Sequence, residues 1–171
     1  QKENLTENDF VIGIAASGRT PYAIGAIEYA KEIGAKTGSI ACNKDAKISS
    51  YADFPIEIET GAEVLSGSTR MKAGTATKLV LNMITTTAMI KIGKVYDNLM
   101  VDVKPTNEKL VDRATKIISE ISGCDYEKSN KLLKEADNNV KLAIIMATKD
   151  VDYEKASEIL EKNKGFIRED L

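Results

Sequence analysis

The segment 16–21, Ala-Ser-Gly-Arg-Thr-Pro, combines hydroxyl groups, a glycine and a cation between a strand-like and a helix-like segment. Backbone N–H groups at a helix start, together with the helix dipole, attract an anion. Ser17 and Thr20 add hydroxyl donors, and Gly18 lets the backbone approach a ligand closely. We therefore expect Ser17, Gly18, Arg19 and Thr20 to line an anion site. An ordinary capped turn would use the same residue types.

A second polar stretch, 66–78, places three cations among hydroxyls and glycines ahead of a long helical pattern. Cations at a helix N-terminus oppose its dipole, so this arrangement needs a reason. An anionic ligand would supply one, and a solvated loop with incidental charges is the alternative. Ser68, Thr69, Lys72 and Lys78 are therefore further candidates for contacts with an anionic ligand.

Other reactive side chains are few. Glu63, in the loop before this stretch, is a weak acid–base candidate, because a lone loop carboxylate is usually just solvated. Asp97 and Asp102 are better explained as caps or members of ion pairs. The two cysteines, Cys42 and Cys124, form neither a disulfide framework nor a zinc knuckle, and we expect them to be packing residues in a reducing cytoplasm.

Composition excludes several classes of function. The 171 residues, 43% hydrophobic and 29% charged, suit one soluble domain of ordinary size, or one domain plus a small helical appendage. A net charge of -2 gives no reason to expect nucleic acid as a partner. The chain has no histidine, which excludes the Ser-His-Asp triad and histidine-ligated metal sites, and we expect no metal. No segment resembles a signal peptide or a membrane span, so we expect a cytoplasmic protein without a membrane partner.

Two kinds of element must position these residues. Apolar runs without alternation predict strands of a parallel sheet, with helices between them. We expect strands at 10–15, 37–42 and 54–58, helices at 21–33, 45–51 and 74–92, and, beyond Pro105, helices only. Pro55 makes the third strand an edge strand, and the helix 74–92 should be well buried because its apolar residues surround the axis. The predicted domains are 1–104 and 105–171.

Four segments together resemble one protein family. They are Ile12–Tyr22, Gly67–Met83, Gly93–Val103 and Thr106–Leu110, and the second is long and specific. The chain is identified as similar to the N-acetylmuramic acid 6-phosphate etherases over nearly its whole length. The resemblance implies an α/β fold: part of a three-layer, parallel-sheet sugar isomerase (SIS) domain that binds phosphosugars. A small helical bundle similar to a ubiquitin-associated domain would follow it.

The resemblance also implies a reaction. Family members cleave the lactyl ether of N-acetylmuramic acid 6-phosphate to D-lactate and N-acetylglucosamine 6-phosphate, which recycles peptidoglycan sugar in the bacterial cytoplasm. One carboxylate removes the C2 proton, a second helps the ether oxygen to leave, and water then adds across the double bond. The implied partner is a phosphorylated amino sugar, with no metal and no organic cofactor. The family also implies a homodimer.

The sequence departs from the family at its start. Members carry a further N-terminal segment with a first strand, a first phosphate loop and the two glutamates assigned as acid and base. Nothing here matches that segment, so we expect a C-terminal portion with little or no activity of its own, and the catalytic residues stay unassigned. The alternative is a noncatalytic sugar-phosphate regulator similar to glucokinase regulatory proteins. A third interpretation makes the helical tail a protein-interaction module, although such bundles are more often packing.

Overall fold

The computed structural model describes residues 4–168 and divides into two compact units. Unit 1 runs from Gln1 to Ile84 and unit 2 from Thr85 to Leu171. Each unit has a hydrophobic core of its own. The domain boundary that the sequence suggests after residue 104 stays a prediction.

Unit 1 is built on a parallel sheet of three strands in the order β1-β2-β3. The strands are β1 (Phe10–Ile14), β2 (Lys36–Ala41) and β3 (Phe54–Glu57). The sheet register pairs Ile12 with Gly38 and Ile40 with Ile56. The α/β fold with a parallel sheet and the edge position of β3 are therefore confirmed.

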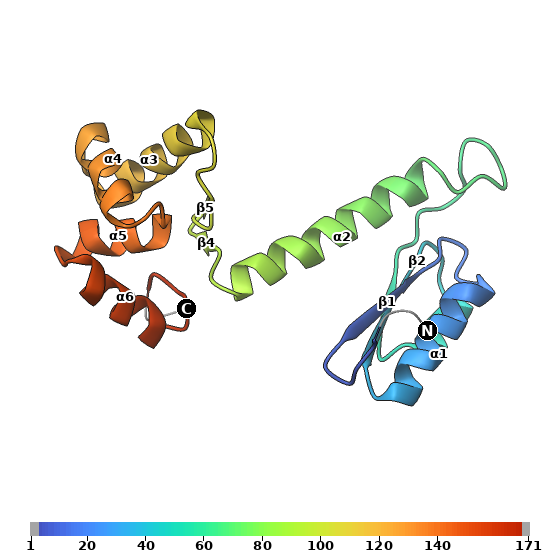
Figure 1. Ribbon diagram of the computed structural model, residues 1–171. Helices are drawn as coiled ribbons and strands as arrows, with labels where there is room; N and C mark the ends of the chain where they lie inside the picture. Colours follow the sequence, from blue (N-terminus) through green and yellow to red (C-terminus); the bar gives the residue numbers. More distant parts are fainter. Residues whose placement is uncertain (1–3, 169–171) are drawn as a thin grey trace. The chain divides into compact units, whose positions relative to one another are not determined.

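One face of this sheet is covered by α1 (Pro21–Ile33) (Figure 1). A short 3-10 helix, η1 (Lys47–Tyr51), packs against the same core through Ile48. Proline occupies the start of α1, and Gly34 ends it in the left-handed conformation with a φ of 91°. The packing is close, because a Cβ on Gly13 would lie 2.6 Å from Cδ1 of Ile27. The buried residues of this core are Ala15, Ala23, Ile24, Ile27, Ala41, Ala46 and Ile48.

The long helix α2 (Lys72–Lys91) forms where expected, but the prediction that it is well buried is wrong. Only Ala73 and Val80 are buried, whereas Leu79 and Met83 are 52% and 60% exposed. The apolar residues surround the helix axis, yet few described elements pack against it. Over the second face of the sheet a cavity of about 320 Å³ remains between the strands and Ile84.

Unit 2 contains the helical bundle that the sequence predicts after Pro105. Its elements are the hairpin β4 (Val95–Tyr96) and β5 (Leu99–Met100), then α3 (Glu108–Ser122), α4 (Tyr126–Glu135), α5 (Val140–Lys149) and α6 (Tyr153–Lys162). Side chains of Asn107, Asp125, Asn139 and Asp152 accept backbone N–H bonds at the four helix starts. The resemblance of this bundle to a ubiquitin-associated domain stays a prediction.

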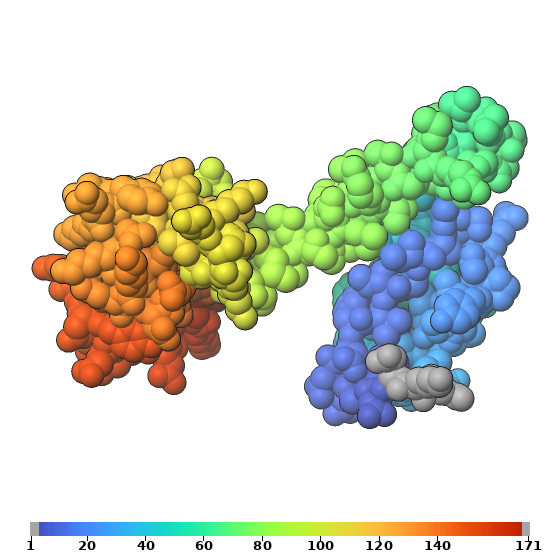
Figure 2. Space-filling view, turned by 45° about the horizontal axis from the view of Figure 1, so that its top comes forward, coloured from blue at the N-terminus to red at the C-terminus, as the bar shows by residue number. Residues whose placement is uncertain are grey.

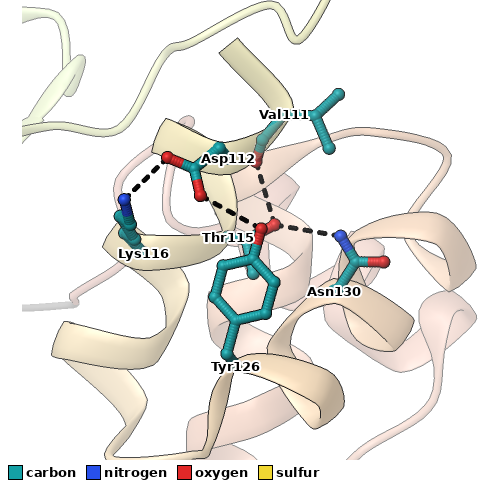
Figure 3. A network of polar contacts seen from close by, with 6 residues as sticks. All are labelled: Val111, Asp112, Thr115, Lys116, Tyr126 and Asn130. Atoms are coloured by element: carbon teal, nitrogen blue, oxygen red, sulfur yellow. Dashed lines mark hydrogen bonds and ion pairs between the residues drawn. The ribbon is translucent and has the colours of Figure 1, made fainter. Parts of the chain in front are cut away.

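A polar network joins α3 to α4 (Figure 3). The Asp112 carboxylate accepts hydrogen bonds from the Tyr126 hydroxyl at 3.1 Å and from Nζ of Lys116 at 2.7 Å. Beside it, Nδ2 of Asn130 donates to Oγ1 of Thr115 at 3.2 Å. Because tyrosine and asparagine come from α4 and their acceptors from α3, the network fixes how these two helices pack.

Asp97 and Asp102 take part in ion pairs, as the sequence suggests. Asp102 pairs with Lys94 at 2.6 Å, and Asp97 pairs with Arg168 at 3.2 Å. The Arg168 guanidinium also lies 4.1 Å from the ring centroid of Tyr96. These two carboxylates are therefore engaged in the structure of unit 2.

Candidate functional site

The turn between β1 and α1 is closed by a backbone hydrogen bond of 2.7 Å from the Gly18 N–H to the Ala15 carbonyl. Gly18 has a φ of +66°, a conformation that favours glycine. A Cβ at this position would lie 2.5 Å from Cβ of Ala46. Glycine is therefore required at the centre of the turn both by the backbone conformation and by the space available.

The segment after β2 holds this turn from behind. The Ala16 carbonyl accepts hydrogen bonds from the Cys42 N–H at 2.9 Å and from Nδ2 of Asn43 at 3.0 Å. The Gly18 carbonyl accepts from the Ile48 N–H at 2.9 Å. The turn is thus fixed by contacts with residues that are distant in the sequence.

The polar side chains of the turn are exposed. Ser17, Arg19 and Thr20 all lie at the surface, and Oγ of Ser17 accepts a 3.4 Å hydrogen bond from the Arg19 N–H. Thr20 occupies the N-cap position of α1, but its side chain makes no capping hydrogen bond. Backbone N–H groups at the start of α1 therefore do not receive the acceptor that the Thr20 side chain could supply. They are left as donors for an anion.

A cavity of about 380 Å³ lies at the carboxyl end of β1, the edge where open α/β sheets bind ligands. Ala16, which leads into the turn, forms part of its wall. The remaining lining residues are Ile14, Thr69, Ala73, Gly74, Thr77, Lys78, Leu81 and Asn82. The fold therefore brings two predicted residues, Thr69 and Lys78, to the sheet edge from which the turn starts.

Glu63 lies at the start of α2. Its carboxylate accepts hydrogen bonds from the backbone N–H groups of Lys72 and Ala73, each at 3.1 Å. These bonds, the Ala73 bond most of all, hold the pKa of Glu63 below its ordinary value of 4.5. A carboxylate of this chain therefore supplies the anion at these two N–H groups, although three cations lie nearby in the sequence.

Two other candidates of this stretch do not line the cavity. Oγ of Ser68 accepts a 3.1 Å hydrogen bond from Nε of Arg70, and Lys72 is exposed at the first turn of α2. The connection of residues 58–71 forms a lobe at the N-terminal end of α2 (Figure 2). Contacts from Ser68 or Lys72 to a ligand stay a prediction.

Several residues of the site were not selected from the sequence. Asn43 and Ala46 support the turn, while Thr77 and Asn82 line the cavity. Asn82 falls within the specific motif Gly67–Met83, which was the available signal. The prediction that Cys42 packs is confirmed: it is 5% exposed, with Sγ 3.6 Å from the Ala73 carbonyl oxygen.

Within residues 4–168, no three Cys, Asp or Glu side chains are grouped so that they could hold a metal ion. In the same part of the chain, no helix has both the length and the apolar character needed to span a bilayer.

The capping contact of Glu63 predicts a pH effect. Folding lowers the pKa of Glu63 from its ordinary value of 4.5. The ionised carboxylate therefore stabilises unit 1 at pH values above 4.5. That stabilisation is lost as the pH falls through the lowered, folded-state pKa. In Glu63→Gln the loss is absent, so the free energy of unfolding should fall less steeply between about pH 6 and pH 3. Urea unfolding at several pH values measures this slope.

Glu59→Gln is the matched control, because the Glu59 carboxylate meets exposed Lys44 at 2.9 Å instead of backbone N–H groups. Equal acid slopes in wild type and Glu63→Gln would contradict the capping role. Asp9, Asp53 and Glu57 also have lowered pKa values, so part of the slope should survive in the variant.

Comparison with known families gives two matches along the chain. The profile of the SIS domain matches residues 1–87, slightly more than half of the chain. The profile described as the C-terminal lid domain of glucokinase regulatory protein matches residues 97–136.

Curated relatives agree over almost the whole chain. An N-acetylmuramic acid 6-phosphate etherase of Exiguobacterium sp. is 60% identical over 98% of this chain, which covers 57% of the relative. The protein of that name from Francisella tularensis subsp. novicida is 58% identical over 98% of the chain and 57% of its own length. That of Geobacillus thermodenitrificans is 58% identical over 100% of the chain and 58% of its own length. The predicted resemblance is confirmed, and the chain spans a little over half of these relatives.

Proposed function

This chain belongs to the SIS domain family, and we propose that it binds a phosphorylated amino sugar as part of an N-acetylmuramic acid 6-phosphate etherase. The observation that carries the proposal is the 58–60% identity to proteins of that name over 98–100% of the chain. The reaction is cleavage of the lactyl ether, which releases D-lactate.

The geometry of unit 1 supports a phosphosugar at the turn after β1. Gly18 gives the turn its positive φ and lets Ala46 pack against it, and Ser17 and Thr20 present exposed hydroxyl groups on either side. The cavity that begins at Ala16 carries the cation Lys78, which would attract the phosphate charge. We therefore assign the phosphate to Ser17–Thr20 at the end of the cavity formed by Ala16, with Lys78 contributing the attracting charge, and the sugar to the cavity itself, where Thr69 is a lining residue.

The etherase reaction requires acid and base groups in addition to a binding site. Elimination requires one group to take the C2 proton and another to protonate the departing ether oxygen, before water adds to the double bond. Glu63 is the loop carboxylate that precedes the cavity-lining residues 69–82, and its oxygens accept hydrogen bonds from the backbone at the start of α2. We infer that the 171-residue chain alone binds the sugar but turns it over weakly or not at all.

We further propose a homodimer in the bacterial cytoplasm, without metal or organic cofactor, in the recycling of cell-wall amino sugar. Exposed apolar side chains on α2 and in the loop before it support an association between copies of the chain. These side chains are Val64, Leu65, Met71, Leu79 and Met83. Two free cysteines, Cys42 and Cys124, suit a reducing compartment.

Calorimetric titration tests the binding half of the proposal. The chain should bind N-acetylmuramic acid 6-phosphate, and N-acetylglucosamine 6-phosphate as the product. It should bind the unphosphorylated N-acetylmuramic acid far more weakly, because the turn supplies its donors to the phosphate. Equal affinity for the phosphorylated and unphosphorylated sugars would contradict the proposal that the turn binds the phosphate group.

The Ser17→Ala variant should bind the phosphosugar more weakly by about 1–3 kcal/mol, the usual contribution of a hydrogen bond to a charged group. Ser50→Ala is the control, because Ser50 is exposed and its hydroxyl donates to the Lys47 carbonyl at 2.9 Å, within η1 itself. Titration of both variants with N-acetylglucosamine 6-phosphate measures the difference. An unchanged affinity in Ser17→Ala would show that the Ser17 hydroxyl does not bind the phosphate and that the turn only begins helix α1.

A second candidate function is a noncatalytic sugar-phosphate regulator. The observation that favours it is the match of residues 97–136 to the lid domain of glucokinase regulatory protein. In that case a phosphosugar would bind and alter the affinity for a partner protein, and no D-lactate would form even after the N-terminal part of an etherase relative is added to the chain. Lactate release in that mixture would favour the etherase, and its absence would favour the regulator.

A further inference from the structure

Glu57 ends β3 and makes three hydrogen bonds to the segment that follows β2. Its Oε2 accepts from the Asp45 N–H at 2.9 Å. Its Oε1 accepts from the Ala46 N–H at 2.9 Å and from the Ser49 hydroxyl at 2.5 Å. One carboxylate thereby fixes both the entrance to η1 and its first turn.

The segment held by Glu57 is the one that supports the anion-binding turn. Cβ of Ala46 is the atom that a side chain on Gly18 would meet. The Ile48 N–H, two residues further along, donates to the Gly18 carbonyl at 2.9 Å. A direct line of contacts therefore runs from Glu57 through residues 45–49 to Gly18.

We propose that Glu57 is a positioning residue for phosphosugar binding: it sets the conformation of the Ser17–Thr20 turn through residues 45–49. This inference rests on the proposed function, because it concerns the same site. The Glu57 carboxylate contacts the supporting segment, so its effect on the ligand is indirect. The bonds from Ser49, Ala46 and Asp45 also keep the pKa of Glu57 below its ordinary value, so it is ionised at neutral pH.

The arrangement is specific to Glu57 and not to carboxylates of this region in general. Glu59, two residues later, pairs with Lys44 at 2.9 Å, and both side chains are more than half exposed. Such a pair adds little to the structure. Glu59 is therefore a matched control with the same charge and nearly the same place in the chain.

The experiment compares Glu57→Ala, Glu57→Gln and Glu59→Gln in the full 171-residue chain. Titration with N-acetylglucosamine 6-phosphate should show about tenfold weaker binding in Glu57→Ala, because a displaced turn misplaces its donors. Glu57→Gln keeps a side-chain oxygen that can accept hydrogen bonds from Ala46 and Ser49. Its affinity should therefore lie between those of Glu57→Ala and wild type. Glu59→Gln should stay within about twofold of wild type. Affinities are measured in conditions where unfolding curves show each variant to be folded.

Amide hydrogen exchange gives a second readout that needs no ligand. The Ile48 N–H should exchange faster in Glu57→Ala than in wild type or in Glu59→Gln, since its acceptor is the turn itself. Wild-type affinity in Glu57→Ala, whatever its stability, would overturn the proposal and leave Glu57 a structural residue. If the wild-type chain binds no phosphosugar, the proposed function fails. In that case, equal exchange rates of the Ile48 N–H in Glu57→Ala and wild type would overturn the positioning role as well.

Discussion

Replacement of Gly18 by alanine is expected to cost unit 1 at least about 2 kcal/mol of stability and to weaken phosphosugar binding about a hundredfold. The φ of +66° is strained for alanine. The new Cβ would also lie 2.5 Å from Cβ and 3.2 Å from Cα of Ala46. Relief of that overlap must move either the turn or residues 45–49, and both support the proposed site.

Gly25→Ala is the matched control. Gly25 lies inside α1, and an added Cβ would meet nothing within 4 Å. Alanine there should raise the free energy of unfolding by about 0.5–1 kcal/mol, because it favours the helix. Urea unfolding and titration of both variants measure the two effects. Gly18→Ala with wild-type stability and affinity would contradict the account of the turn.

A double variant separates the two causes. Ala46→Gly removes the Cβ that a side chain at residue 18 would meet, so Gly18→Ala should cost less in that background. The strain of the positive φ is untouched by the second substitution, so recovery should be partial. Full recovery would assign the whole effect to the overlap with Cβ of Ala46, and no recovery would assign it to the positive φ together with the remaining approach to Cα of Ala46.

The second large effect concerns turnover. The isolated chain is expected to release D-lactate from N-acetylmuramic acid 6-phosphate at least about a hundredfold more slowly than a full-length relative, because its loop carboxylate Glu63 is held as a helix cap and each positioned acid or base typically contributes about 10²–10⁴-fold. Addition in trans of the N-terminal part of a relative should restore turnover if that part carries the acid and base. An enzymatic assay for D-lactate measures each case.

Glu63→Gln decides the role of Glu63 in the same assay. Its carboxylate is held by two backbone N–H groups and its pKa is lowered, which suits a cap better than a base. We therefore expect a change in stability larger than any change in lactate release. Robust turnover by the isolated chain that is lost in Glu63→Gln would transfer the catalytic role to Glu63.

Much of unit 1 follows from local sequence patterns. The apolar run at 10–15, Pro21 at the helix start and Gly34 at its end predict β1 and α1 closely. The β4–β5 hairpin was not predicted, because strands of two residues are too short to show any periodicity. The burial of α2 was overestimated, because an apolar pattern shows what a helix could bury and not what lies against it.

The candidate site was predictable only in part, for a similar reason. The residue types at 16–21 indicate an anion-binding turn without reference to any other segment. The close approach of Ala46 to Gly18 and the bonds of Glu63 to the start of α2 join residues that are nine or more positions apart. Such contacts depend on tertiary structure, and no local spacing rule predicts them.

The most direct test of phosphosugar binding at the turn after β1 is a titration of the isotope-labelled chain followed by NMR. On addition of N-acetylmuramic acid 6-phosphate, we expect the largest amide shifts at Ser17–Thr20, with further shifts at Thr69 and Lys78. The unphosphorylated sugar at equal concentration should leave Ser17–Thr20 unshifted. Shifts confined to unit 2, or none at Ser17–Thr20 at saturating phosphosugar, would contradict the central claim.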